Sequence, residues 1–154
     1  MDVKKRAKII TDWINNYCET VSYKPKALIV GISGGIDSSV VSTLCAITGR
    51  KTIVLTMPIK QIKSQQDLSL SHAKWLKQNY KNVEHHLLEM DKIFTSFTEV
   101  LNKFDNEHGY ANSRARLRMA TLYQVAAANN GIVVGTGNKV EDFGVGFYTK
   151  YGDG

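Results

Sequence analysis

The sequence predicts an α/β protein with a doubly wound, parallel β-sheet. Short, continuously apolar runs alternate along the chain with longer stretches that carry apolar residues at three- and four-residue spacing. This alternation is typical of parallel strands covered on both faces by crossover helices. A glycine-rich segment at residues 31–39 follows the first apolar run, at the position where such folds bind their ligands. The chain contains no internal repeat, low-complexity stretch or linker, so a single domain over residues 1–154 is expected.

The first elements are a helix, a strand and a second helix. The first helix ends before Lys24 and Pro25, because proline cannot continue it. Its expected core face consists of Ile10, Trp13, Ile14, Tyr17, Cys18 and Val21. Residues 27–32 form a continuously apolar run and therefore a buried parallel strand, and residues 38–47 form the helix that follows it.

The middle of the chain supplies two more strands around a third helix. Residues 52–57 are a second continuously apolar strand, and residues 82–88 are a less regular third one. The helix between them is expected to begin near Ser64, which has capping-box spacing to Asp67, and to end near Gln78. Its predicted inner face consists of Leu68, Trp75 and Leu76.

Two helices and a strand complete the predicted fold. A clear apolar helical stripe consists of Ile93, Phe94, Phe97, Val100, Leu101 and Phe104. A further helix runs from about residue 112 to residue 128, where the sequence Asn-Asn-Gly at 129–131 stops it, and residues 132–135 form the fourth strand. These stripes are interpreted as core. Right-handed crossovers then give the Rossmann-like strand order 3-2-1-4.

The loop at residues 31–39 has the properties of a phosphate cradle. Gly34 and Gly35 allow a tight turn that points backbone N–H groups at an anion, and the following helix adds the positive end of its dipole. Hydroxyl donors are supplied by Ser33, Ser38 and Ser39. The loop is not a Walker A motif, because Asp37 stands where that motif has lysine. Since an acid repels phosphate unless a cation lies between them, Asp37 is predicted to bind Mg²⁺. The alternative is a purely structural strand-to-helix turn.

The net charge of +6 raises the possibility of nucleic-acid binding, since basic surfaces attract phosphates. However, the basic residues are dispersed along the chain. The cluster of Lys4, Lys5, Arg6 and Lys8 lies on the solvent face of the first helix. We therefore expect no nucleic-acid partner, and attribute the charge to anionic small-molecule ligands.

Other features argue against a secreted, membrane or metal-thiolate protein. Cys18 and Cys45 lie on apolar helical stretches without metal-ligand spacing, so buried thiols are expected. His85 and His86 are adjacent and would point to opposite faces of a strand. No apolar run is long enough to span a bilayer, and the N-terminus lacks a secretory signal, so a cytoplasmic location is expected.

Three segments resemble those of a known family. The sequence Ser-Gly-Gly-Ile-Asp-Ser at 33–38 resembles the pyrophosphate loop of the ATP-pyrophosphatases. Residues 112–119, Asn-Ser-Arg-Ala-Arg-Leu-Arg-Met, and residues 133–154, which begin Val-Val-Gly-Thr-Gly-Asn-Lys-Val-Glu, resemble the substrate helix and second ATP loop of ammonia-dependent NAD⁺ synthetases. The segments occur in the order of that family. The resemblance implies a fold like that of the adenine nucleotide alpha hydrolases.

The activity implied by this resemblance is the Mg²⁺-dependent amidation of deamido-NAD⁺. The nicotinate carboxylate attacks the α-phosphate of ATP, pyrophosphate leaves, and ammonia then converts the acyl-adenylate to NAD⁺ with release of AMP. No protein nucleophile is required. One alternative is another ATP-pyrophosphatase, an amidotransferase or a tRNA-modifying enzyme, which shares the first loop but not the arginine-rich helix. A second alternative is a nucleotide-binding or nucleic-acid-binding domain without catalytic activity.

The resemblance also assigns roles to individual residues. The implied ATP-binding residues are Gly31, Ile32, Ser33, Gly34, Gly35, Ile36, Asp37, Ser38 and Thr136. Glu141 matches the family's Mg²⁺ ligand and would share the ion with Asp37, so both count as catalytic. Asp153 stands where a carboxylate orients ammonia or takes its proton.

The arginine-rich segment is expected to divide between two helix faces. Arg114 and Arg118 are four residues apart and share a face, whereas Arg116 points nearly the opposite way. Arg116 matches the family's arginine at deamido-NAD⁺, and Lys150 matches its lysine there. Arg118 is a candidate for either nucleotide, and Arg114 is interpreted as solvated. Asn112 either positions deamido-NAD⁺ or caps the helix.

Four further expectations concern the completeness of the domain, the second loop, the nitrogen donor and the assembly. The sequence stops at Tyr-Gly-Asp-Gly, where family members continue, so we expect an incomplete domain without a fifth strand. The spacing from Glu141 to Lys150 is one residue longer than in the family motif, so the residues between them receive no individual roles. Only 26 residues precede the first strand, which favours free ammonia over glutamine as the donor. A homodimer through the helices at 93–128 is expected from the resemblance and the apolar stripes.

Overall fold

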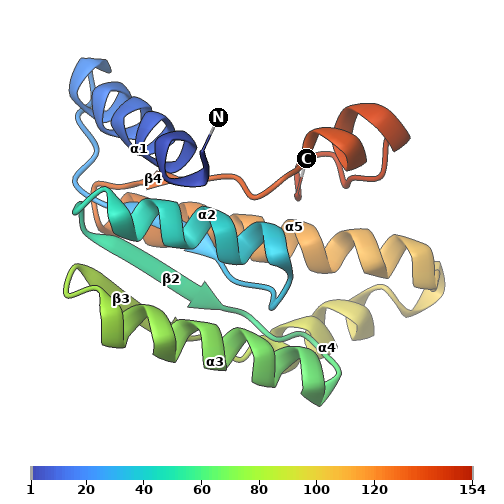
Figure 1. Cartoon of the computed structure of the whole chain (residues 1–154). Helices are drawn as coiled ribbons and strands as arrows, with labels where there is room; N and C mark the ends of the chain where they lie inside the picture. Colours follow the sequence, from blue (N-terminus) through green and yellow to red (C-terminus); the bar gives the residue numbers. More distant parts are fainter. Residues whose placement is uncertain (1, 154) are drawn as a thin grey trace.

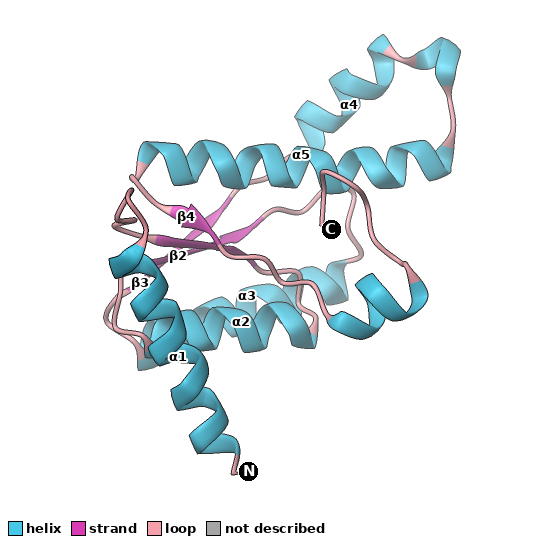
Figure 2. Cartoon of the chain, turned by 90° about the horizontal axis from the view of Figure 1, so that it is seen from above, coloured by secondary structure: helices cyan, strands magenta, loops and turns pink. Residues whose placement is uncertain are grey.

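The computed structural model describes residues 2–153 and contains a four-stranded parallel sheet with helices on both faces (Figures 1 and 2). Its elements are α1 (Val3–Thr20), β1 (Leu28–Gly31), α2 (Ile36–Ile47), β2 (Thr52–Thr56), α3 (Lys63–Asn79), β3 (Val83–Leu87), α4 (Asp91–Val100), the 3₁₀ helix η1 (Asn102–Phe104), α5 (Glu107–Ala128), β4 (Ile132–Val133) and the π-helix η2 (Val140–Val145). The strand order is β3-β2-β1-β4. The predicted fold class and strand order are confirmed.

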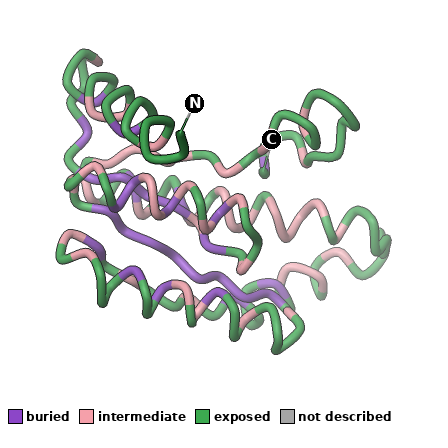
Figure 3. The backbone as a smooth tube through the Cα atoms, in the orientation of Figure 1, coloured by how far each residue is buried: buried purple, intermediate pink, exposed green. Residues whose placement is uncertain are grey.

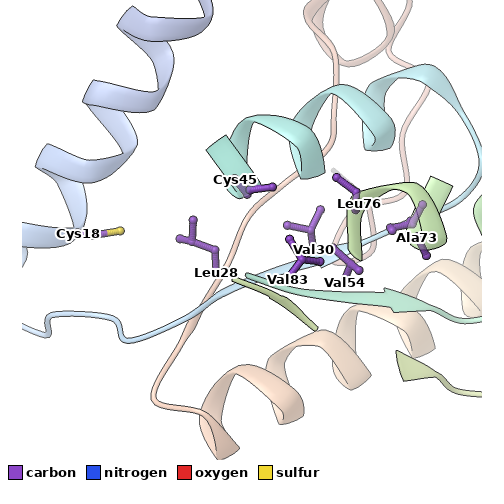
Figure 4. Packing of buried hydrophobic residues seen from close by; sticks show 10 residues of the cluster. Cys18, Leu28, Val30, Cys45, Val54, Ala73, Leu76 and Val83 are labelled. Atoms are coloured by element: carbon purple, nitrogen blue, oxygen red, sulfur yellow. The ribbon is translucent and has the colours of Figure 1, made fainter. Parts of the chain in front are cut away.

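Two hydrophobic clusters hold the helices on the sheet. Leu28 and Val30 of β1 face α2 and α3, where they pack with Cys45 and Leu76 (Figure 4). Ile29 lies between them in the chain and joins the opposite cluster, in which α4 and α5 take part. This alternation follows from the two-residue period of a strand. All five residues of β2 are buried, and the buried part of the chain follows this strand through the centre of the molecule (Figure 3).

The parallel register brings the carboxyl ends of the strands to one edge of the sheet. Leu28 pairs with Thr52 on one side and with Ile132 on the other. Ladder-like hydrogen bonds continue past the strand ends, from Ile32 N to Leu55 O at 2.8 Å and from Val134 N to Ile29 O at 2.9 Å. The loops after β1, β2 and β4 therefore leave the sheet side by side.

The predicted core face of α1 is only partly correct. Cys18 is buried in the cluster with Leu28, but Trp13 is 63% exposed, and Ile10 and Tyr17 are also exposed. The N-terminal part of α1 extends away from the sheet (Figure 2), so only its later turns pack on the core. The three- and four-residue spacing correctly predicted an amphipathic helix but overestimated the length of its contact.

The prediction for α3 was wrong in its cap and in part of its inner face. Ile62 occupies the N-cap position without a side-chain hydrogen bond, and Ser64 lies inside the helix. Leu68 and Trp75 are exposed. The buried residues of α3 are Ser69, Ala73 and Leu76. Two of these are small, which lets α3 approach its neighbours closely and turns the larger apolar side chains outward.

The second half of the chain differs from expectation at helix ends. The apolar stripe is divided between α4 and η1, with Phe94 buried but Ile93, Val100 and Phe104 exposed. The last helix begins before Asn112, because Asn106 is its N-cap and accepts a hydrogen bond from Gly109 N at 2.8 Å.

The remaining sequence expectations concern the cysteines and membrane segments. Cys18 and Cys45 are free and buried, as predicted, and burial raises the pKa of Cys45 to about 12. Among residues 2–153, none of the helices combines the length and apolar character that a bilayer crossing requires.

Candidate functional site

A cavity of about 1090 Å³ lies at the carboxyl ends of the strands. Its walls come from the loops after β1, β2 and β4, from α4 and the segment after it, and from the side of α5 that carries Arg114 and Arg118. In an open parallel sheet, ligands bind in such a crevice where the chain leaves neighbouring strands in opposite directions. Here β1 leads through α2 to its neighbour β2, and β4 pairs with the other side of β1. The cavity is therefore the candidate site.

The predicted phosphate loop forms a tight turn against α3. Gly34 has φ of +91°, and a Cβ atom at this position would lie 2.7 Å from the carbonyl oxygen of Gln65. Both the backbone conformation and the close approach require glycine. Gly35 is the N-cap of α2, and its N–H donates to Ser33 Oγ at 3.1 Å. The sequence had suggested that this N–H points at an anion, but in the structure it is bonded within the loop.

Serine hydroxyls close the loop onto the first turn of α2. Ser38 Oγ donates to Gly35 O at 3.1 Å and lies 3.1 Å from Ser33 Oγ. Ser38 Oγ also accepts a hydrogen bond from Ser33 N at 3.2 Å. Ser39 Oγ donates to Gly35 O at 2.8 Å. These contacts hold the loop in one conformation, with the N-terminus of α2 at the cavity.

The two predicted acidic residues are linked through a residue that the sequence analysis did not single out. Asn138 Nδ2 donates to Asp37 Oδ2 at 3.3 Å, and Asn138 Oδ1 accepts hydrogen bonds from Val140 N and Glu141 N, both at 3.0 Å. Asp37 and Glu141 both line the cavity. One amide therefore joins the loop after β4 to the first turn of α2. The only available sequence signal was its place between Thr136 and Glu141.

The donor set fits Mg²⁺ supplied with a phosphate ligand. Within residues 2–153, no three His, Cys, Asp or Glu side chains gather as a metal cluster. Two carboxylates from separate loops suit Mg²⁺, which is held in such sites by one or two carboxylates together with water and substrate phosphates.

The three arginines of α5 divide between two sites, as their spacing predicts. Arg114 and Arg118 line the cavity, whereas Arg116 lines a separate shallow pocket with Lys150. The walls of the shallow pocket consist of Arg116, Met119, Ala120, Tyr123, Lys150, Tyr151 and Gly152. Arg116 Nε donates to Lys150 O at 3.1 Å.

The interpretation of Arg114 as a solvated residue was wrong. Its side chain is 25% exposed and forms an ion pair with Glu107 at 3.2 Å. Its guanidinium carbon also lies 5.4 Å from the ring centre of Phe94, within cation–π range. An ion pair and an aromatic face therefore hold Arg114 in the cavity wall.

Arg118 is the second arginine in the cavity wall. Its Nε donates to Met57 O at 2.9 Å, which fixes the side chain at the end of β2. Burial lowers the pKa of Arg118, and the charge of Arg114 lowers this pKa further, while Asp153 acts in the opposite direction. None of the ion pairs formed within residues 2–153 includes Arg118. A half-buried guanidinium that lines a cavity without an ion-pair partner is complementary to an anion.

The C-terminal turn is attached to α5 and serves both sites. Thr149 Oγ1 donates to Asn112 Oδ1 at 2.8 Å, and Thr149 N donates to Asp153 Oδ1 at 2.6 Å. Buried Gly152 packs against Ala115. Asp153 thereby lines the cavity, and Lys150 lines the shallow pocket.

Asn112 is neither a helix cap nor a wall residue of either described pocket. It lies inside α5, and its carboxamide oxygen accepts the hydrogen bond from Thr149. Its role in the structure is to hold the C-terminal turn. Thr136, in contrast, lines the cavity as expected.

A parallel sheet of order 3-2-1-4, with an acidic glycine-rich loop after its first strand, is the arrangement of Rossmann-like nucleotide-binding proteins. The family model for NAD synthase matches residues 6–154. The chain belongs to the NAD synthase family.

Individual relatives agree with this assignment. The chain is 35% identical to an NH(3)-dependent NAD(+) synthetase of Staphylothermus marinus, over 97% of this chain and 54% of the relative. It superposes on an NMN synthetase from Francisella tularensis with a TM-score of 0.88 at 30% identity, covering 99% of this chain and 61% of that one. The corresponding values for an NH3-dependent NAD synthetase from Campylobacter jejuni, solved with nitrate, are 0.86, 31%, 99% and 64%. The chain thus spans about half to two thirds of the length of these relatives.

Proposed function

We propose that the chain is the ATP-binding part of an ammonia-dependent NAD⁺ synthetase that amidates deamido-NAD⁺ through an acyl-adenylate. The family assignment supports this reaction class. The observation that carries the proposal is the division of α5, which directs Arg118 into a cavity closed by the glycine-rich loop and Arg116 into a neighbouring pocket. The two cationic pockets share Met119 and Gly152 as wall residues, so they adjoin, which suits a reaction between two anionic substrates.

The cavity is proposed to bind ATP. The loop residues 31–38 surround the phosphates, and Thr136 contacts the nucleotide from the loop after β4. Arg118 offers its guanidinium edge to a phosphate oxygen, because Met57 already holds its Nε. Apolar Met57 and Ile59 line the same cavity and suit the adenine ring.

Asp37 and Glu141 are the proposed Mg²⁺ ligands. A bound Mg²⁺ would supply charge stabilisation for the departing pyrophosphate. Asn138 links α2 to η2, the helices that carry these carboxylates, by donating to Asp37 and accepting from the N–H of Glu141. The residues of the chain thus orient the reacting groups, and no side chain acts as a nucleophile.

The shallow pocket is proposed to bind deamido-NAD⁺. Arg116 and Lys150 provide positive charge for its phosphates or carboxylate, and Asn112 positions the turn that carries Lys150. Asp153 reaches the cavity from the same turn and is proposed to orient ammonia. A homodimer is proposed as well, with exposed Ile93 and Tyr123 in the contact region.

A mononucleotide acid is the second candidate substrate, because a solved relative is an NMN synthetase. Pyrophosphate release by the full-length protein should be measured with ATP, Mg²⁺ and ammonium chloride, in the presence of deamido-NAD⁺ or nicotinate mononucleotide. We expect the dinucleotide to give the higher kcat/KM. Preference for the mononucleotide would make it the substrate in place of deamido-NAD⁺. Pyrophosphate release that instead requires tRNA or GMP precursors would contradict the proposal.

A further inference from the structure

A part-buried hydrogen bond joins α2, the helix that follows the phosphate loop, to its neighbour α3. Ser42 Oγ of α2 lies 2.9 Å from Nε2 of His72 on α3. Ser42 is fully buried at 0% exposure. None of the roles proposed above uses either residue. A buried hydroxyl is costly unless it is hydrogen-bonded, so the contacts of Ser42 need an explanation.

The direction of this hydrogen bond follows from the other contacts of Ser42. Its hydroxyl donates to Ser38 O at 2.7 Å, with a longer contact to Ser39 O at 3.2 Å. Because the single hydroxyl proton is used there, Ser42 Oγ accepts from Nε2–H of His72. Burial lowers the pKa of His72, against a smaller raising effect of the Ser39 backbone, which favours the neutral imidazole. Full burial of Ser42 excludes a role as a nucleophile, although a serine and a histidine are paired.

Both partners of the pair lead to the phosphate loop. Ser38 accepts the hydroxyl of Ser42 through its carbonyl oxygen and holds Ser33 and Gly35 through its own hydroxyl. On the other side, α3 forms the wall behind Gly34, since a Cβ atom there would lie 3.3 Å from the backbone nitrogen of Ser69. His72 is one turn further along α3. The pair therefore fixes α2 and α3 relative to each other at the point where they enclose the loop.

We propose that His72 is a positioning residue for the phosphate loop, which keeps the Gly34 turn seated between α2 and α3 through its hydrogen bond to Ser42. This inference rests on the proposed function, because it assigns the loop to the phosphates of ATP. Loss of the bond lets α3 shift from α2, and the loop then binds MgATP less tightly. The KM for deamido-NAD⁺, which is assigned to the shallow pocket, should not change.

The test compares four single variants of the full-length protein and the double variant His72→Leu, Ser42→Ala. His72→Leu removes the donor, whereas His72→Gln keeps a side-chain N–H at the reach of Nε2. Ser42→Ala removes the acceptor from the other side. His85→Leu is the matched control, because His85 is also half-buried and bonds a threonine hydroxyl, Thr56 Oγ1 at 3.0 Å, but contacts the sheet instead of α2. The readouts are the Kd of MgATP by titration calorimetry, steady-state KM values, and stability in urea.

We expect His72→Leu and Ser42→Ala to weaken MgATP binding by about three- to tenfold, without additivity in the double variant. His72→Gln should restore the Kd to within about twofold of wild type. His85→Leu should lower stability but leave the Kd unchanged. An unchanged Kd in His72→Leu, or equal weakening by His85→Leu, would overturn the inference. Failure of the wild type to use deamido-NAD⁺ would contradict the proposed function alone, since the Kd of MgATP is measured without it.

Discussion

Asn138 Nδ2 donates a hydrogen bond to Asp37 Oδ2 across 101 positions of sequence, at 3.3 Å. The same amide accepts two backbone hydrogen bonds at the start of η2, from Val140 and Glu141. The segment after β4 and the first turn of α2 thereby share one polar contact. This contact and the parallel pairing of β1 with β4 bring together the backbone segments that carry the two carboxylates.

Asn138→Ala should raise the Mg²⁺ concentration needed for half-maximal pyrophosphate release. The substitution removes the link between the loops but no metal ligand, so a shift of about three- to tenfold is expected, with little change in kcat at saturating Mg²⁺. Asn16→Ala on the exposed part of α1 is the control and should behave as wild type. An unchanged Mg²⁺ requirement in Asn138→Ala would mean that the loops hold their positions without this amide.

Asp37→Asn should have a much larger effect than Asn138→Ala. It removes a charge from the proposed Mg²⁺ site while preserving size and shape, so adenylation should be lost and the fold retained. Circular dichroism and thermal unfolding check the fold, and pyrophosphate release checks the activity. Wild-type release at limiting Mg²⁺ would remove Asp37 from the metal site.

The arginines of α5 should separate the two substrates kinetically. Arg118→Ala should raise the KM for ATP, and Arg116→Ala should raise the KM for deamido-NAD⁺. Each substitution should remove about 2 kcal/mol of charge-assisted binding free energy. Arg114→Ala should mainly lower stability, because Arg114 already has Glu107 and Phe94 as partners. The measurement is a full matrix of KM values for the three variants. The same substrate dependence for Arg116→Ala and Arg118→Ala would contradict two separate sites.

The sequence predicted the sheet better than the helix surfaces. Continuous apolar runs fix a parallel strand because both of its faces are covered, which is why β2 matched closely. Helix faces depend on how the axis lies against its neighbours. Trp13 and Trp75 have core-like spacing but are exposed, since α1 diverges from the sheet and α3 packs through small residues instead.

The candidate site shows the same limit. Asp37 was predicted from the glycine-rich loop, and Thr136 and Glu141 from the family resemblance, and all three line the cavity. Asn138 and His72 were missed, because their roles arise from hydrogen bonds between elements far apart in sequence. A single sequence carries no record of such contacts.

Stability should fall as the pH is lowered below about 6.5. Burial lowers the pKa values of His72 and His85 in the folded protein from an ordinary value of 6.5. The unfolded chain therefore binds more protons than the folded one below pH 6.5, so the free energy of unfolding decreases there and is insensitive to these groups above it. Urea unfolding at pH 7.5 and pH 5.5 measures the change. In the double variant His72→Gln, His85→Gln this part of the pH dependence should disappear, and its persistence would assign the effect to other groups.

Gly34→Ala should destabilise the protein far more than Gly49→Ala, although both glycines have positive φ, +91° and +78°. A left-handed conformation costs an alanine about 1–2 kcal/mol at either position. Nothing lies within 4 Å of a Cβ at Gly49, whereas at Gly34 the backbone oxygen of Gln65 would be 2.7 Å away. The additional loss at Gly34, about 2 kcal/mol, reflects the displacement of α3 from the loop, and MgATP binding should weaken with it. Urea unfolding and calorimetry on the two variants measure both effects. Equal destabilisation would show that α3 yields at no cost and that only the backbone conformation of Gly34 requires glycine.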